Sequence, residues 1–240
     1  MSLIKVVTFD MWNTLVKDKD YTDQRVKCLA DSLLRSNVKR TYDEIRKAYM
    51  TTQEYVRRVW RDEDYRFVPV EVRLEHTLKR LSARLPKDRR LRVLKELREL
   101  AVMDPPELVE GIKETLDPLS SKYKLGVICD TGFTPGIGMR EILARHGILR
   151  FFSATVFSDE NGYCKPHRTM FEKVLDKLSV EPSQTVHVGD LLHTDIAGAK
   201  AAGMKAVWFN TTRKINLGRI RPDYEIGTFP EIVMLLERMS

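Results

Sequence analysis

Four aspartates and one lysine carry the chemistry that this sequence suggests. Each stands directly after a short apolar run or in a loop near one: Asp10, Asp130, Lys165, Asp190 and Asp195. Carboxylates that pack together repel one another and raise one another's pKa values unless a positive charge lies between them. Oxygen ligands of this kind hold a hard divalent cation, and a lysine offsets the charge of an anionic substrate. The five side chains therefore predict metal-assisted chemistry on an anion, provided that the fold brings them together.

Strands that alternate with helices would position these side chains. The predicted strands span 4–9, 124–129, 152–158, 186–189 and 205–209, and helices span 137–146, 169–178 and 195–202. This alternation is typical of the α/β class, with a Rossmann-like, doubly wound parallel sheet. Ligands of such sheets bind beyond the carboxyl ends of the strands, where the five side chains fall. Asp195 is also predicted to cap the helix that follows it.

A helical segment separates the first strand from the rest of the sheet. Thr41 and Glu44 form a capping box, and apolar residues with helical spacing follow. Pro69 and Pro86 each precede a stripe of leucines, which predicts two further helices. We therefore predict an all-helical domain over 17–104.

The positive charge of the chain gathers in this helical segment. The 240 residues include 41 Lys and Arg against 34 Asp and Glu, a net charge of +7. Between Lys17 and Asp104 there are 23 basic and 16 acidic side chains, so this segment holds the whole excess. Two interpretations stay open: solvated helix faces with paired charges, or a positive rim that gathers an anionic substrate. A nucleic-acid partner is not expected, because no basic tail or run of interleaved aromatic and basic residues is present.

Cysteine usage and the N-terminal sequence indicate the compartment. Cys28, Cys129 and Cys164 are widely spaced and lack the CxxC pattern of zinc and redox sites, so we expect reduced thiols. The apolar run Ile4–Phe9 is too short for a signal peptide or a membrane span. We expect a cytoplasmic protein without membrane contact, as a monomer or homodimer.

The motifs resemble those of the haloacid dehalogenase-like (HAD) hydrolase superfamily, in an archaeal-type form. The similar segments are Phe9–Leu15, Cys129–Gly132, Lys165–Pro166 and Gly189–Asp195, in the order and spacing of that family. The resemblance extends over nearly the whole chain. It implies that 17–104 is a cap domain inserted into a core of 1–16 and 105–240, where it closes over the crevice.

The resemblance also implies roles for individual residues. Asp10 is expected to be the nucleophile that forms a covalent aspartyl intermediate, with Lys165 orienting it and the phosphate. Magnesium is expected to bind Asp10, Asp190, Asp195 and the backbone carbonyl of Trp12. Contacts to a small anionic substrate or its phosphate are expected from Asn13, Thr14, Cys129, Asp130 and Thr131.

Three positions depart from the family pattern. HAD phosphatases usually carry an aspartate two residues after the nucleophile, which protonates the leaving group. Here that residue is Trp12, whose indole N–H cannot exchange a proton in this role. The Ser or Thr of the second motif is replaced by Cys129, a weak donor, and Thr131 is the alternative donor. Asp130 stands where the family often has Asn.

These departures leave more than one function open. An aromatic residue at position 12 is shared with the 2-haloacid dehalogenase branch, which needs neither a leaving-group acid nor a metal. Gly189-Asp190 and Asp195 instead favour a metal-dependent phosphatase, because clustered carboxylates without a cation would be costly. We predict a phosphatase that prefers aryl or acyl phosphates, with a dehalogenase-like hydrolase or a non-catalytic binding protein as alternatives.

Overall fold

The computed structural model describes residues 3–239, so residues 1, 2 and 240 of the predicted core lie outside it. The chain divides into two compact units: Met1–Asp18 with Pro106–Asp130 and Leu143–Ser240, and Lys19–Pro105 with Thr131–Ile142. Sequence analysis placed 131–142 in the core. In the structure this segment groups with the helical unit, because Phe133 packs into the apolar core of the helices.

The first unit is built on a six-stranded parallel sheet with the order β3-β2-β1-β4-β5-β6. Its strands are β1 (Val6–Phe9), β2 (Lys124–Cys129), β3 (Phe152–Phe157), β4 (Thr185–Gly189), β5 (Lys205–Phe209) and β6 (Tyr224–Ile226). The predicted Rossmann-like α/β fold is thus confirmed. The sixth strand was not predicted from the sequence.

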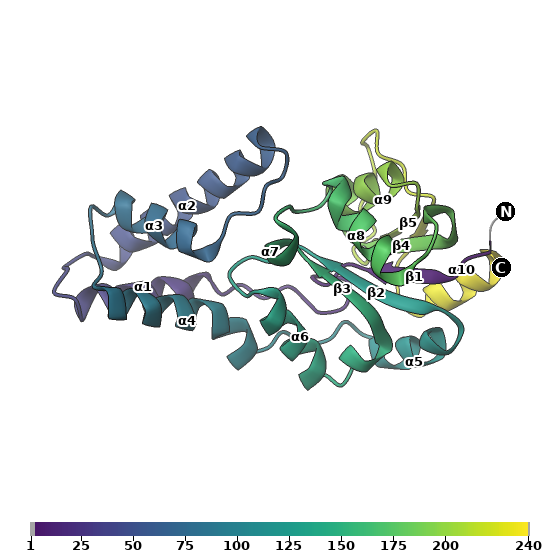
Figure 1. The fold of residues 1–240 in the computed structure, drawn as a ribbon, viewed down its shortest axis with the longest axis horizontal. Coiled ribbons are helices and arrows are strands. Elements are labelled where there is room, and N and C mark those ends of the chain that lie inside the picture. The colour runs from purple at the N-terminus through teal and green to yellow at the C-terminus, as the bar shows by residue number, and fades with distance from the viewer. Residues whose placement is uncertain (1–2, 240) are drawn as a thin grey trace. The chain divides into compact units, whose positions relative to one another are not determined.

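Helices cover both faces of this sheet (Figure 1). They are α5 (Ile112–Lys122), α8 (Arg168–Leu178), α9 (Ala197–Ala201) and α10 (Glu231–Met239), while the short helix α7 (Ser158–Asn161) directly follows the end of β3. On one face, Val6 and Ile128 pack with Phe171 of α8 in a fully apolar cluster. On the other face, the ring of Phe9 lies 5.5 Å from that of Phe229. Burial of apolar side chains on both faces explains why the strands read as almost continuous apolar runs.

The central position of β1 decides where the polar residues meet. Phe9 pairs with Val127 of β2 on one side and with Val188 of β4 on the other. The next backbone N–H, that of Asp10, still donates to the carbonyl of Val188 at 2.9 Å. Asp10 therefore lies at the carboxyl edge of the sheet, between the loops that follow β2 and β4.

The second unit contains four long helices: α1 (Thr22–Leu34), α2 (Tyr42–Asp62), α3 (Val70–Arg80) and α4 (Lys87–Met103). The predicted capping box is confirmed: the Thr41 hydroxyl accepts from the Glu44 N–H, and the Glu44 carboxylate accepts from the Thr41 N–H. Pro69 and Pro86 directly precede α3 and α4. Buried apolar side chains from all four helices form one core. Helix α6 (Gly136–Arg145) begins in this unit and ends in the first.

The structure also bears on the cysteines and on membrane-spanning helices. Cys28, Cys129 and Cys164 all carry reduced thiols, as predicted. Within residues 3–239, no helix has the length and apolar character needed to cross a bilayer.

Candidate active site

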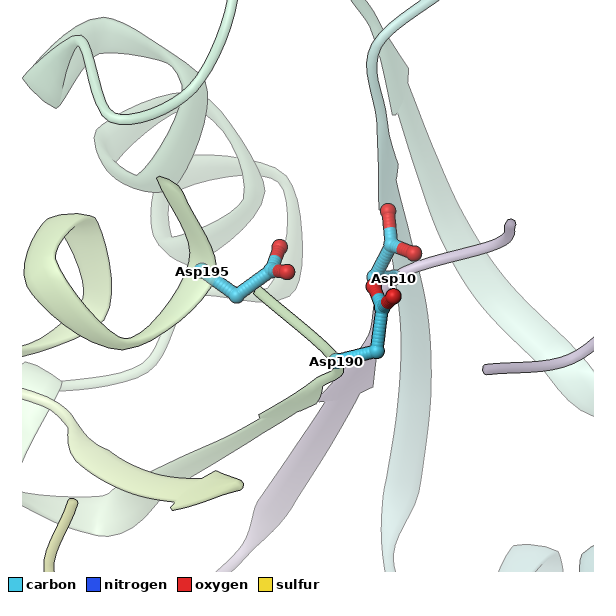
Figure 2. Close-up of side chains that lie close together, drawn as sticks. All are labelled: Asp10, Asp190 and Asp195. Carbon is cyan, nitrogen blue, oxygen red and sulfur yellow. The ribbon is translucent and has the colours of Figure 1, made fainter. Parts of the chain in front are cut away.

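Three of the predicted carboxylates meet at the carboxyl edge of the sheet. Asp10 follows β1, whereas Asp190 and Asp195 lie in the segment after β4 (Figure 2). One carboxylate oxygen from each residue lies within 4.8 Å of the others. Asp10 and Asp195 are buried, and Asp190 is half-buried. Asp10 thus meets two carboxylates that lie 180 and 185 residues further along the chain, as expected for strand-end residues of one sheet.

Lys165 provides the positive charge that this cluster needs. Its Nζ donates to Oδ1 of Asp10, to Oδ1 of Asp195 at 2.6 Å and to the carbonyl of Ile128 at 3.0 Å. The side chain is 2% exposed. Although burial alone would lower the pKa of Lys165, the two carboxylates raise it well above its usual range, so the ammonium is charged. All three of its protons are directed at acceptors.

Asp195 is the most firmly held of the carboxylates. Its Oδ1 binds Lys165, and its Oδ2 accepts from the backbone N–H of Leu191 at 3.0 Å. Burial would raise the pKa of Asp195, but Lys165 and His187 outweigh burial and hold that pKa below its usual range. Asp195 is not an N-cap, as the sequence had suggested, because it lies inside a π-helical turn, Leu192–Ile196. Its carboxylate bonds back to Leu191 instead of to the first N–H groups of α9.

The remaining carboxyl groups titrate at higher pH. Burial, reinforced by Asp195, raises the pKa of Asp190 to about 6. Burial also raises the pKa of Asp130 to about 6, although Lys165 acts in the opposite direction. Burial also raises the pKa of Asp10, and the nearby Asp195 and Asp190 raise it further, although Lys165 acts in the opposite direction. Burial is the largest cause of each of these raised pKa values, and the single positive charge of Lys165 does not outweigh it.

Asp130 holds the loop that carries Lys165. Its Oδ1 accepts from the backbone N–H of Lys165 at 2.8 Å. The side chain is partly exposed. Asp130 thus connects the end of β2 to the residue whose ammonium contacts Asp10.

His187, on β4, is a member of this network that sequence reasoning missed. Its Nε2 lies 3.4 Å from Oδ1 of Asp195, and its Nδ1 lies 2.9 Å from the hydroxyl of Thr8. Burial lowers the pKa of His187, which favours the neutral ring. An ionised Asp195 must face an N–H, so Nε2 carries the proton and Nδ1 accepts from Thr8. The signal in the sequence was a polar pair, Thr8 and His187, inside two apolar strands.

The loop after Asp10 contains three more predicted site residues. Trp12 is partly exposed and forms an isolated bridge with Val16. Asn13 is exposed, and its Oδ1 accepts from the N–H of Asp18 at 3.0 Å. Thr14 is fully buried, and its hydroxyl has no hydrogen-bond partner among the described residues. Asn13 also lines a pocket of about 420 Å³ together with Asp190.

Cys129 and Thr131, the two alternative phosphate donors of the segment Cys129–Gly132, occupy different surroundings. Cys129 is fully buried at the end of β2, its Sγ lies 3.6 Å from the carbonyl of Asp130, and burial raises the pKa of its thiol. Thr131 is 2% exposed and groups with the helical unit. His193, which lies between Asp190 and Asp195 in the sequence, is exposed.

The donor set fits a hard cation. The three clustered side chains offer only carboxylate oxygens, the ligands that magnesium and calcium prefer. With Asp10, Asp190 and Asp195 ionised, the single charge of Lys165 leaves two negative charges uncompensated. A divalent cation would offset this excess, whereas sulfur and imidazole ligands of the kind that zinc selects are missing from the cluster.

Comparison with known proteins identifies the family. The haloacid dehalogenase-like hydrolase family matches residues 4–203. The chain belongs to this family. It is a HAD hydrolase, as the resemblance of its motifs implied.

The relatives include phosphatases and dehalogenases. The chain is 30% identical to a glyceraldehyde 3-phosphate phosphatase of Pyrococcus furiosus, over 99% of this chain and 95% of that protein. A HAD phosphatase of Thermococcus onnurineus has a similar structure, with a TM-score of 0.68, 25% identity and coverage of 97% and 98%. A 2-haloacid dehalogenase of Pseudomonas syringae gives a TM-score of 0.77 at 24% identity, with coverage of 99% and 100%. The last similarity concerns the fold alone, so the comparisons favour a phosphatase over a dehalogenase.

Proposed function

We propose that this protein is a magnesium-dependent phosphatase that hydrolyses a small phosphate monoester through an aspartyl phosphate on Asp10. The observation that supports this most directly is the position of Lys165. Its ammonium lies between Asp10 and Asp195 at the carboxyl edge of the sheet, with Asp190 beside them. A lysine in this position can offset the charge of a nucleophilic carboxylate and of an incoming phosphate at once.

Asp10 is the better nucleophile among the clustered carboxylates. Both oxygens of Asp195 already accept hydrogen bonds, from Lys165 and from Leu191. Only Oδ1 of Asp10 is held, and among residues 3–239 its Oδ2 has no hydrogen-bond partner. Oδ2 would attack phosphorus in line, forming the aspartyl phosphate while the bond to the leaving oxygen breaks. Water would then cleave this intermediate and return Asp10 to its ionised form.

Asp10, Asp190, Asp195 and the carbonyl of Trp12 would hold the magnesium ion. When bound, the ion supplies positive charge to the equatorial phosphate oxygens as negative charge develops there. The contribution of the chain is to hold these oxygens in place, and the hydrogen bonds of Asp195 fix the most buried of them.

The substrate is proposed to be a small phosphorylated molecule, such as a triose phosphate. Full-length similarity to a protein named as a glyceraldehyde 3-phosphate phosphatase supports this class. Phosphate contacts are assigned to Asn13, Thr14, Cys129, Asp130 and Thr131, and the buried, unpartnered hydroxyl of Thr14 is the most suitable donor among them. The helical segment 17–104 is proposed to act as the cap, and the protein to act as a monomer or homodimer.

Phosphate and halide release measured side by side would test the proposal. We would incubate the protein with glyceraldehyde 3-phosphate and p-nitrophenyl phosphate, with magnesium or with chelator, and measure chloride release from 2-chloropropionate in parallel. Metal-dependent phosphate release that disappears in Asp10→Asn is the expected result. Chloride release that ignores the chelator would instead favour the dehalogenase, for which Trp12 is the specific argument. Absence of both activities would favour a binding protein.

A further inference from the structure

A proposed phosphatase of triose phosphates needs a proton donor that Trp12 cannot supply. When Asp10 attacks an alkyl phosphate, the departing oxygen leaves as an alkoxide unless an acid protonates it. An indole N–H is a hydrogen-bond donor but not an acid in this pH range. Some other group near Asp10 must therefore provide the proton.

Most of the polar groups near Asp10 are excluded by their contacts. The three protons of Lys165 are bound to Asp10, Asp195 and Ile128. Asp195 is ionised, and both of its oxygens accept hydrogen bonds. The Cys129 thiol is fully buried, and burial keeps its pKa far above neutral.

Asp190 is excluded by its place in the metal cluster. Its carboxylate lies within 4.8 Å of ligand atoms from Asp10 and Asp195. A carboxylate that binds a cation is ionised and has no proton to give. Asp130 is another acidic side chain at this edge of the sheet, and it is hydrogen-bonded to the loop that carries Lys165.

We infer that Asp130 is the general acid of the reaction, protonating the leaving oxygen through the carboxyl oxygen that does not bind the lysine loop. Its Oδ1 accepts from the N–H of Lys165 at 2.8 Å, which orients the carboxyl group. Within the described part of the chain, Oδ2 has no hydrogen-bond partner, and the side chain is partly exposed. One oxygen is thus fixed while the other remains available to a substrate.

The position of Asp130 relative to the nucleophile supports this role. Asp130 follows β2 directly, and β2 is the neighbour of β1 with Phe9 paired to Val127. Lys165 joins the two residues, because its N–H binds Asp130 and its Nζ binds Asp10. Burial raises the pKa of Asp130 to about 6, so a protonated fraction is present near neutral pH.

The proton balance of the two steps is complete. In the first step the Oδ2–H bond of Asp130 breaks, its proton goes to the leaving oxygen, and the alcohol departs as the Asp10–phosphorus bond forms. In the second step the Asp130 carboxylate takes a proton from the attacking water. Inorganic phosphate leaves, and Asp10 and Asp130 return to their starting states. No co-reactant other than water is needed.

The test compares substrates whose leaving groups differ in their need for a proton. We would measure kcat/KM for glycerol 1-phosphate, an alkyl ester, and for p-nitrophenyl phosphate, whose leaving group is stable as an anion. Asp130→Asn keeps an oxygen for the Lys165 N–H but removes the acid. The ratio of p-nitrophenyl to glycerol phosphate activity should rise about 100-fold or more in Asp130→Asn, the size typical of general acid catalysis.

Two further measurements separate acid catalysis from a structural role of Asp130. In Asp130→Ala, the Lys165 loop also loses its anchor, and additional activity on both substrates should be lost. Trp12→Asp should restore part of the glycerol phosphate activity in Asp130→Asn by supplying an acid from the neighbouring loop. An equal loss on both substrates in Asp130→Asn, without rescue by Trp12→Asp, would overturn the inference.

The inference rests on the proposed function, and measurements on the wild-type protein show which of the two fails. We would measure the rate for a series of aryl phosphates whose leaving groups differ in pKa. In the wild type the rate should depend only weakly on the pKa of the leaving group, and in Asp130→Asn it should fall steeply as that pKa rises. A steep dependence in the wild type would reject Asp130 as the acid and leave the phosphatase assignment intact. No phosphate release from any ester would reject the phosphatase and, with it, the role of Asp130.

Discussion

The carboxylate of Asp195 occupies the space that a side chain at residue 189 would need. A Cβ added to Gly189 would lie 2.7 Å from Oδ2 of Asp195, and closer still to its Cγ. The backbone of Gly189 does not have a left-handed conformation, so the need for glycine is one of space. The Gly189-Asp190 pair therefore does more than place Asp190, because its glycine lets Asp195 reach Lys165.

Gly189→Ala should displace Asp195 and weaken catalysis. A shift of about 1 Å in a group that positions the site can cost about 100-fold in rate. We expect kcat for p-nitrophenyl phosphate to fall by about this factor, and the free energy of unfolding to fall by about 1–3 kcal/mol from overpacking. Gly227→Ala is the matched control, since the nearest atom to its added Cβ is 3.9 Å away. Full activity in Gly189→Ala would show that Asp195 can move without consequence.

Removal of the Lys165 ammonium should destabilise the fold as well as the reaction. Lys165→Met leaves Asp10 and Asp195 buried without their partner, and the loss of one member of a buried ion pair typically costs about 3–5 kcal/mol. Urea unfolding should register a loss of this size, against almost none for Lys173→Met, an exposed position on α8. In an Asp195→Asn background the same substitution should cost less, since fewer charges are left unpaired. If the stability losses of Lys165→Met and Asp195→Asn simply add in the double variant, the two side chains do not stabilise each other.

The sequence was informative wherever local chemistry determines structure. The strand Lys124–Cys129 has the bounds that its apolar run predicted, and Thr41 and Glu44 form the expected capping box. The convergence of Asp10, Asp190 and Asp195 also followed from a general rule, because the carboxyl ends of parallel strands share one edge.

Features that depend on distant partners were not predictable. Helix α5 contains Pro118 and was missed, since proline normally ends a helix. The π-helical turn over Leu192–Ile196 depends on where Asp195 must place its carboxylate. The contact of His187 with Asp195 depends on how the chain folds around β4, and the polar residues Thr8 and His187 inside apolar strands were a signal of burial but not of this partner.

Magnesium should stabilise the protein through its carboxylate cluster. A ligand that binds only the folded state adds about 2.7 kcal/mol at a concentration 100 times its Kd. Thermal unfolding should therefore shift upward with magnesium and return to its starting value with chelator. Asp190→Asn should abolish most of this shift, whereas Asp176→Asn, an exposed residue of α8, should leave it intact. An unchanged shift in Asp190→Asn would place the ion elsewhere.

The stability that Asp223 provides should depend on pH. Its carboxylate accepts from Lys200 and from the Ala206 N–H, each at 2.9 Å, and so connects the approach to β6 with β5. Partial burial would raise the pKa of Asp223, but these hydrogen bonds outweigh burial and lower that pKa below its usual range.

A carboxyl group whose pKa is lower in the folded state stabilises that state above its unfolded pKa, and this contribution disappears as the pH falls through the folded value. Asp223→Asn should thus reduce the free energy of unfolding at pH 7 by about 1 kcal/mol, the usual size for one hydrogen bond. The difference from the wild type should shrink steadily below about pH 4, where the unfolded chain takes up the proton. Denaturant unfolding of both proteins between pH 3 and pH 7 measures this directly. A difference that stays constant over the range would mean that the charge of Asp223 adds nothing, and that its contribution comes from shape alone.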